Sequence, residues 1–371
     1  MERALLGGAT AARFLARYWQ RRPLLIRRAI PGFRGLLSWR ELVALAARDD
    51  VETRLVVRER GRWKLAHGPF RSRDLRALPE RNWTLLVQGV NLHVAAADAL
   101  LRRFAFIPYA RLDDLMVSYA APGGGVGPHF DGYDVFLVQG EGRRRWRLSR
   151  QRDLALQPGL PLKILARFRP ALEHVLEPGD MLYLPPGVAH DGVAIDACSS
   201  YSIGFRAPSA QELATAFLDW LADRIELTGR YRDPGLEPAR SPARIGPALS
   251  AYAARALRGL AWDDRAVARF LGSYLSEPKP AVSFAPPRPA LPRGTFLARA
   301  SRRGVRLDSR TQLLYDARNL FINGEALGRP AKGWATLRRL ANARELPKGA
   351  FDAGAADLLY RWYRDGFLHL E

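Results

Sequence analysis

The sequence predicts a mainly β protein with helical parts, an α+β chain in three successive regions. In the first region, residues 1–208 with a core at about 98–208, short apolar runs alternate with turns rich in glycine and proline, a pattern typical of β-strands. Residues 209–279 lack strand signals and space their apolar side chains as a helix does. A proline-rich linker over 280–294 leads to residues 295–371, which combine short strands with two helices.

The core of the first region begins with a strand and a glycine-rich segment. Polar or adaptable residues at 114, 116 and 118 alternate with apolar residues at 115, 117 and 119, so the two faces of this strand differ. The run 122–128 contains four glycines, which let the backbone pass close to a site.

Signals for three further strands follow in this region. An apolar strand at Val135–Val138 and a tight turn at Gly140–Gly142 lead into a strand at Arg143–Trp146, which we expect to pair with the first as a hairpin. A strand at Met181–Leu184 then ends in a turn at Pro185–Gly187 that presents His190.

His129, Asp131 and His190 are the candidate metal ligands. Two imidazoles and one carboxylate are the set that holds non-heme Fe(II) on one face and leaves the other positions open. In a strand, residues i and i+2 point to the same side, so His129 and Asp131 can reach one metal, and His190 would come from a distant strand folded alongside. An isolated H-x-D is common by chance, and the flanking turns and strands give this one its weight.

The second region carries signals for three helices. Ser209 and Glu212 form a capping box, and apolar residues follow it at helical spacing. We expect further helices over 247–260 and 263–275. Interpreted without any relative, these helices are a cover for the β-rich region within one subunit.

The third region combines strands at 305–307, 312–315, 319–322 and 367–370 with helices at 334–343 and 355–364. Asn323-Gly324 has the composition of a two-residue hairpin turn. The second helix carries Leu358, Leu359, Trp362 and Tyr363, a core-like set and not a basic recognition surface. This favours a structural or protein-contact role.

Three long runs resemble the JmjC-type ribosomal oxygenases, and more closely their bacterial branch of ribosomal-protein arginine hydroxylases. The runs are DDLMVSYAAPGGGVGPHFDGYDVFLVQGEGRRRWRL, EPGDMLYLPPGVAHDGVA and YSIGFRAPSAQEL, and the upstream run FLARYWQRRPLLIRRA is also similar. The resemblance implies a cupin-like double-stranded β-helix for the first region, a helical dimerisation region, and a winged-helix domain. It also implies that Fe(II), 2-oxoglutarate and O2 are used to hydroxylate the β-carbon of an arginine in a large-subunit ribosomal protein.

Arg144 is the candidate partner for the distal carboxylate of 2-oxoglutarate. The planar fork of an arginine binds a carboxylate through two parallel bonds. Strand alternation puts Arg144 on the side of Trp146, which we expect to face inward, and the family resemblance points to the same arginine. Arg143 and Arg145 share the other face and are expected in solvent. Ser118 is a second candidate contact of 2-oxoglutarate.

The polar face of the 114–118 strand suggests where a substrate arginine binds. We expect Asp114 to pair with its guanidinium, and Met116 and Tyr133 to pack against its stem. Ser200 and Ser202 share one strand face and are expected at the same cavity mouth. The alternative for Asp114 is a role in a turn with Asp113.

Two other functions are kept open. One is a JmjC hydroxylase that acts on a ribosomal-protein histidine or another target. The other is a non-catalytic ribosome-assembly binding protein, against which the intact ligand triad and Arg144 argue.

Composition bounds the location and the partners. Cys198 is the only cysteine, so no internal disulfide or cysteine-based metal cage can form. The first residues lack the features of a signal peptide, and no stretch reaches the roughly 18 apolar residues of a membrane helix. We therefore expect a cytoplasmic protein with no membrane contact.

The chain is strongly basic, with a net charge of +21 and a pI near 10.9. Such a charge favours a weak RNA or ribosome contact through the basic surface. However, the 58 basic residues include only five lysines, and a bias toward arginine also results when nucleotide composition drives codon use. Both explanations are kept.

Overall fold

The first two hundred residues form two β-sheets that pack face to face, in a computed structural model that describes residues 5–350 and 352–371. Within these residues, the larger sheet has eight strands in the order β1-β9-β6-β11-β5-β4-β2-β3, and the smaller has three in the order β10-β7-β8. Neighbouring strands in both sheets are antiparallel. This is the predicted double-stranded β-helix, a jelly-roll relative, and the prediction is confirmed.

The bounds of these strands follow the apolar runs of the sequence. They are β1 (Leu24–Ile26), β2 (Thr53–Glu59), β3 (Arg62–His67), β4 (Trp83–Val87), β5 (Leu112–Ala120), β6 (Val135–Gln139), β7 (Arg144–Leu148), β8 (Leu172–Leu176), β9 (Met181–Leu184), β10 (His190–Ala194) and β11 (Cys198–Phe205). Apolar side chains from both sheets, such as Leu137 and Leu182 from one and Leu148 and Leu176 from the other, fill the space between them.

The strands on either side of Gly140–Gly142 do not pair with each other, so the predicted hairpin is wrong. β6 pairs with β9 and β11 in the larger sheet, whereas β7 pairs with β8 and β10 in the smaller one. The turn therefore carries the chain from one sheet to the other. Local pattern cannot separate the two outcomes, because a hairpin and a crossing between sheets both need a short glycine-containing turn.

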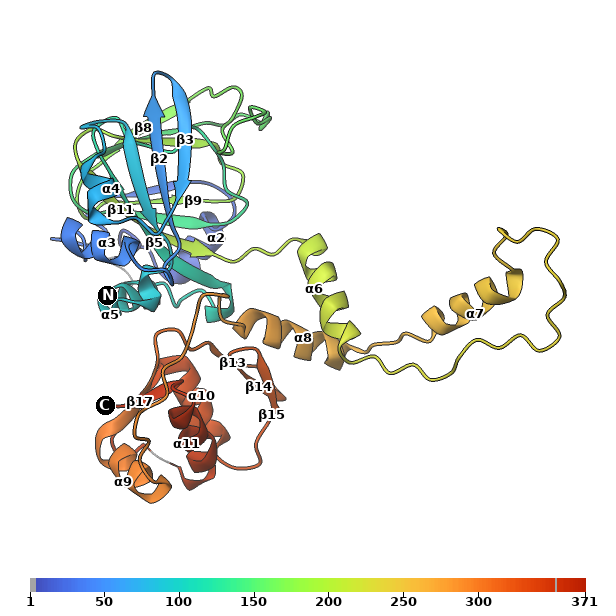
Figure 1. The fold of residues 1–371 in the computed structure, drawn as a ribbon. Helices are drawn as coiled ribbons and strands as arrows, with labels where there is room; N and C mark the ends of the chain where they lie inside the picture. The colour runs from blue at the N-terminus through green and yellow to red at the C-terminus, as the bar shows by residue number, and fades with distance from the viewer. Residues whose placement is uncertain (1–4, 351) are drawn as a thin grey trace.

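Helices cover the outer face of the larger sheet (Figure 1). Phe136 of β6 contacts Phe14 of α2 and Phe104 of the turn after α5, with ring centroids 5.4 and 4.8 Å away. The apolar residues of β5, Leu115 and Val117, join the same core. The polar face of β5 consequently points between the two sheets. The helices are α2 (Ala11–Arg17), α3 (Trp39–Ala46), α4 (Ser72–Arg76) and α5 (Ala95–Arg102), with short 3-10 turns η1 (Val90–Leu92) and η2 (Tyr109–Arg111).

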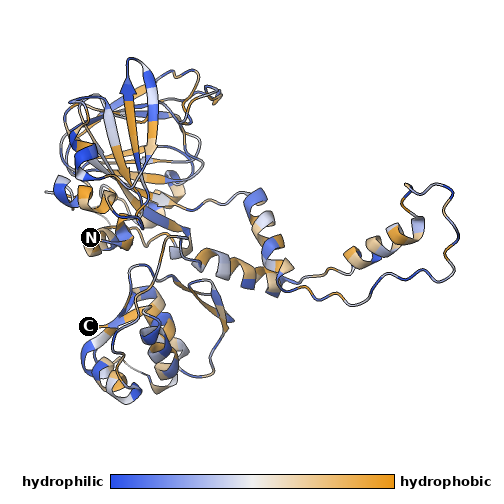
Figure 2. Ribbon diagram, viewed as in Figure 1, coloured by the Kyte–Doolittle hydropathy of each residue, from blue (hydrophilic) through white to orange (hydrophobic). Residues whose placement is uncertain are grey.

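The second region is helical, as predicted. Its helices are α6 (Ala210–Ala222), α7 (Pro247–Arg258) and α8 (Asp264–Ser276), and the Ser209–Glu212 capping box is formed at the start of α6. Figure 1 shows α7 on a long arm that extends away from the rest of the molecule. Figure 2 shows that α7 nevertheless carries hydrophobic residues.

The third region follows the predicted order of strands and helices. It contains α9 (Arg293–Arg303), β12 (Gly304–Leu307), β13 (Leu313–Tyr315), β14 (Asn319–Ile322), β15 (Glu325–Gly328), α10 (Trp334–Ala343), β16 (Glu345–Pro347), η3 (Ala353–Ala355), α11 (Ala356–Arg364) and β17 (Leu368–Leu370). Asn323 and Gly324 both have positive φ and turn β14 into β15, as a two-residue hairpin turn requires. Helix α9 was not predicted, and it begins inside the expected linker.

Two packing features refine the organisation of the C-terminal half. Leu359 and Trp362 of α11 are buried in the core, so its core-like pattern is confirmed. Helix α8 packs against β14 and β15 of the third region, although the sequence groups it with the preceding helices. Gly272 allows this approach, because an added Cβ would lie 2.2 Å from the Phe321 ring. Among the described residues, no helix is long and apolar enough to span a membrane.

Candidate functional site

The structure brings His129, Asp131 and His190 together at one end of the space between the sheets. One ligand atom from each of the three lies within 4.8 Å of the other two. His129 and His190 form an antiparallel bridge, in which the two backbones exchange N–H···O bonds of 2.9 and 2.8 Å. The backbone N–H of Gly187 also donates to the carbonyl of Asp131, at 2.8 Å. Two distant segments are thus held in register at the triad.

The segment of His129 and Asp131 is not the regular strand that the spacing argument assumed. It is an extended stretch that makes only this bridge, between the glycine run and β6, whereas His190 begins β10. The extended backbone still places both side chains on one side.

Each histidine presents its Nε2 atom to the site. The Nδ1 atoms of His129 and His190 lie 2.8 Å from the carbonyl oxygens of Gly127 and Val188. A carbonyl can only accept, so each Nδ1 carries the proton and each Nε2 keeps a free lone pair. This arrangement orients the rings and selects the tautomer that binds a metal.

Burial shifts the pKa values of His190 and Asp131. It lowers the pKa of His190 to about 3, with a smaller contribution from the nearby His129, so His190 is neutral, the form that ligates a metal. Burial also raises the pKa of Asp131, although His129 and a hydrogen bond from Tyr133 oppose this change. A divalent cation at the three ligand atoms would favour the ionised carboxylate. Two imidazoles and one carboxylate are a ligand set that fits Fe(II).

Arg144 lies deeper between the sheets and has unused hydrogen-bonding capacity. Its side chain is buried, and its Nη1 donates to Ser118 Oγ at 3.2 Å. Among the described residues, no acceptor reaches its buried Nε and Nη2 atoms. These two N–H groups form the edge of a guanidinium that binds a carboxylate through two parallel bonds. Because unpaired buried donors are costly, the site fits an anionic ligand.

The neighbouring arginines take the opposite side of β7, as alternation predicts. Arg143 pairs with Asp196 at 2.8 Å and Arg145 with Glu173 at 3.4 Å, and both arginine side chains are about half exposed. Neither can replace Arg144 inside the cavity.

Strand register connects Arg144 to the metal ligands. β7 and β10 pair so that His190 lies opposite Leu148 and Ala194 lies opposite Arg144, all on one face. The His190–Leu148 pair and the Ala194–Arg144 pair are four residues apart, roughly 13 Å along a strand. An arginine side chain and a five-carbon dicarboxylate can together span this distance. Trp146 lies between the two pairs, with its ring 5.8 Å from that of His190.

Gly192 makes the position of this tryptophan possible. A Cβ at Gly192 would meet the Trp146 ring at 2.7 Å. No local pattern singles out this glycine, because its partner is on another strand.

The predicted cavity residues of β5 and β11 lie side by side on adjacent strands of the larger sheet. Ser200 pairs with Ser118, and Ser202 pairs with Met116. Ser200 is buried, and its hydroxyl donates to Gln139 Oε1 at 3.1 Å. It therefore lies at the Arg144 end and not at the mouth, where we had expected it. Ser202 and Met116 lie one pair nearer the mouth and are half-buried.

Asp114 is within β5 and not in a turn, and its carboxylate is already engaged. Its Oδ2 accepts hydrogen bonds from Gln88 Nε2, Gly89 N and Lys279 Nζ, at 2.7, 3.0 and 3.1 Å. The sequence did not identify Gln88 or Lys279 as site residues, because they come from distant segments with no motif of their own. Burial raises the pKa of Asp114, and the Lys279 ammonium is the largest opposing influence.

Tyr133 lies at the cavity mouth, between the triad and Asp114. Its side chain is 43% exposed. Burial of the hydroxyl and the charges of Asp131 and Asp114 raise its pKa, so it stays a neutral phenol. Together, the triad and Asp114 lie toward one end of the space between the sheets, and Arg144 and Ser118 lie toward the other end.

Comparison with known proteins identifies relatives along nearly the whole chain. Residues 99–213 match the JmjC domain family, and residues 259–369 match the ROXA-like winged-helix family. The ribosomal protein uL16 3-hydroxylase of Escherichia coli (strain K12) is 38% identical over 328 residues, which cover 85% of each chain. A probable ribosomal oxygenase of Haemophilus influenzae is 32% identical and covers 96% of this chain and 95% of its own.

A solved structure shows the same fold with ligands present. It is that of YcfD, a ribosomal oxygenase from Escherichia coli, in complex with cobalt and 2-oxoglutarate. It superposes with a TM-score of 0.81 at 33% identity and covers 98% of both chains.

Proposed function

The chain belongs to the ribosomal oxygenases of the JmjC family, and on this basis we propose that it hydroxylates the β-carbon of an arginine in a large-subunit ribosomal protein. It is a 2-oxoglutarate-dependent oxygenase with a C-terminal winged-helix domain. The observation that carries the proposal is a metal triad between the two sheets, together with a buried arginine that has two unsatisfied donors and a buried carboxylate at Asp114.

In this proposal, His129, Asp131 and His190 hold Fe(II) through Nε2, a carboxylate oxygen and Nε2. Bound iron, 2-oxoglutarate and O2 supply the oxidising chemistry, and the protein positions the reactants. The Gly127 and Val188 carbonyls keep the imidazoles oriented. Arg144 holds the distal carboxylate of 2-oxoglutarate with Nε and Nη2, while Ser118 holds Nη1 in place.

The mouth supplies the contacts for a target arginine. Asp114 receives the guanidinium, and Met116 and Tyr133 pack against the methylene stem, with Ser202 beside Met116. The name of the Escherichia coli relative points to a protein of the uL16 class as the substrate. A ribosomal-protein histidine is the second candidate target. The carboxylate of Asp114 favours the positively charged arginine over a neutral histidine.

Replacing Asp114 by asparagine should depress arginine-peptide hydroxylation by tenfold or more, because a lost charged hydrogen bond costs about 1.5 to 3 kcal/mol. Iron and 2-oxoglutarate binding should persist. Mass spectrometry of arginine-containing and histidine-containing ribosomal peptides would show the gain of one oxygen. Asp113→Asn, on the adjacent half-exposed carboxylate, is the matched control and should have a smaller effect. Hydroxylation of histidine but not arginine would overturn the substrate assignment.

We also propose that the chain forms a homodimer through its helical arm. Large apolar side chains on and beside α7 are exposed, Leu249 at 44% and Leu257 at 65%, and Ile245 at 74%. An isolated helix of this length is marginal in water unless an apolar face is buried against a partner. A two-fold interface lets the same face serve both subunits.

Charged residues at Leu249 and Leu257 should convert the dimer to a monomer, as measured by light scattering. Phe217 of α6 is unsuitable for this test, because its ring packs on Trp262 and Phe270 of its own chain and its replacement would disrupt the arm itself. Arg255→Glu, on another face of α7, should leave the dimer intact. A monomeric wild-type protein would rule out the interface.

A ribosomal substrate places the enzyme in the cytoplasm in this proposal. The net charge of +21 would then assist a weak contact with ribosomal RNA. The apolar side of α11 is buried in the core, so we assign this contact to the arginine-rich surface.

A further inference from the structure

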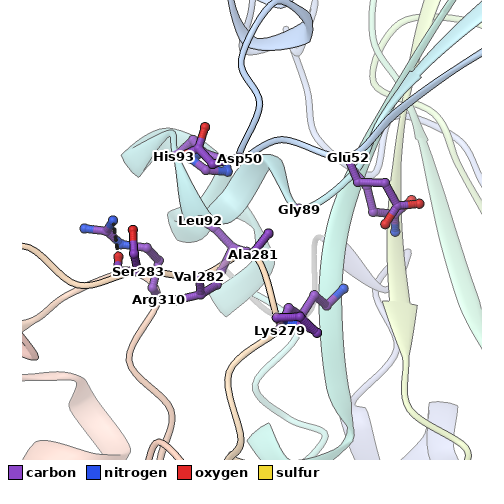
Figure 3. A pocket seen from close by; sticks show the side chains of 12 residues that line it. Asp50, Glu52, Gly89, Leu92, His93, Lys279, Ala281, Val282, Ser283 and Arg310 are labelled. Carbon is purple, nitrogen blue, oxygen red and sulfur yellow. Dashed lines mark hydrogen bonds between the residues drawn. The ribbon is translucent and has the colours of Figure 1, made fainter. Parts of the chain in front are cut away.

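Lys279 reaches from the end of the helical region to the mouth of the cavity. It follows α8 by three residues, and its Nζ lies 3.1 Å from Asp114 Oδ2 and 3.3 Å from Asp113 Oδ1. Its side chain is 35% exposed, whereas that of Asp114 is 5% exposed. Figure 3 shows its side chain extending from the segment after α8 toward the sheet. A cation of the protein itself therefore sits on the carboxylate that we assign to the substrate.

The three donors to Asp114 differ in how firmly they are held. Gly89 donates from its backbone, and Gln88 extends from the end of β4, so both belong to the β-rich body. All three donors share Oδ2, and among the described residues no donor reaches Oδ1. A carboxylate offers about four lone-pair sites on its two oxygens. Lys279 has a long flexible stem, so it is the partner that can leave.

A cavity beside Lys279 can accommodate its side chain when it leaves Asp114. Its side chain lines a cavity of about 290 Å³, together with Gln88, Gly89 and Glu52 (Figure 3). Burial alone would lower the pKa of Lys279, but the carboxylates of Asp114 and Asp113 raise it overall, so it remains an ammonium. When it leaves Asp114, it can keep its contact with Asp113.

We propose that Lys279 is a resident cation that occupies Asp114 in the empty enzyme and is displaced when the guanidinium of the substrate binds. This inference rests on the proposed function. The ammonium compensates the buried carboxylate while no substrate is present, and a guanidinium then takes both carboxylate oxygens through two parallel bonds. Because only enzyme with a free Asp114 binds the substrate, Lys279 weakens the observed affinity by the fraction of time that it is bound.

The test compares Lys279→Met and Lys279→Arg in the full-length enzyme at pH 8, with an arginine-containing ribosomal peptide. If Lys279 holds Asp114 nine-tenths of the time, its removal should lower the peptide KM roughly tenfold with little change in kcat. Lys279→Arg keeps the cation and adds a second bond, so its KM should equal or exceed that of wild type. The melting temperature of Lys279→Met without peptide should fall, because the same contact stabilises the empty enzyme.

A purely structural lysine predicts the opposite order. In that case Lys279→Met would raise the KM or lower kcat, and Lys279→Arg would resemble wild type; either result overturns the inference. In an Asp114→Asn background, Lys279→Met should no longer lower the KM, and an unchanged effect would also contradict the proposal. Wild-type enzyme that fails to hydroxylate arginine peptides would remove the proposed function and this inference together. Turnover with the wrong order of KM values removes this inference alone.

Discussion

Replacing His129 or His190 by alanine should reduce 2-oxoglutarate turnover to background, since each change removes one of three metal ligands. The fold should persist, because the bridge between the two segments uses backbone atoms, whose bonds of 2.9 and 2.8 Å do not involve the side chains. Iron content after anaerobic reconstitution and succinate production measure the two effects separately. We expect both to fall together.

His67→Ala is a suitable control for these variants. His67 is exposed at the end of β3, outside the cavity, and its loss should change neither iron content nor turnover. In the absence of metal, circular dichroism should give the same melting temperature for the control and for the two ligand variants. Wild-type succinate production by either ligand variant would rule out the triad.

Arg144→Ala should raise the KM for 2-oxoglutarate steeply. The distal carboxylate would lose its charged partner in a buried site, which costs about 2 to 5 kcal/mol, or roughly 30-fold or more in affinity. The variant also removes two buried donors that have no partner among the described residues of the protein, so the ligand-free enzyme should not lose stability in proportion. Calorimetric binding of 2-oxoglutarate to the metal-loaded enzyme checks the loss without requiring turnover.

Arg143→Ala is the matched control, since Arg143 carries the same charge on the adjacent position and points to solvent. It should change the KM for 2-oxoglutarate little. Arg144→Lys should recover only part of the affinity, because an ammonium cannot form the two parallel bonds. Equal effects of Arg143→Ala and Arg144→Ala would contradict the assignment of the pocket.

Local patterns carried much of the architecture. Alternation along residues 114–119 separated the core-facing Leu115 and Val117 from the cavity face, and the same rule placed Arg144 inside and Arg143 outside. Periodicity and capping residues located α6, α10 and α11. These features depend on the direction of neighbouring side chains, which the backbone geometry of a strand or helix dictates.

Local patterns did not predict which distant segments pair or pack together. The turn at Gly140–Gly142 predicted a hairpin, but it joins two sheets. The pairing of a strand depends on the strands that the rest of the fold places beside it. Helix α8 likewise packs against β14 and β15, which lie some fifty residues later in the chain.

The chemistry of the site divides in the same way. The types and spacing of His129, Asp131 and His190, and the alternation that buries Arg144, are properties of short segments, so the sequence alone determined the candidate ligands. Tertiary structure alone decided that Ser200 binds Gln139 and that Lys279 occupies Asp114. Lys279 is 165 residues from Asp114. No local rule couples positions so far apart, because only the folded chain fixes which of many carboxylates a flexible ammonium can reach.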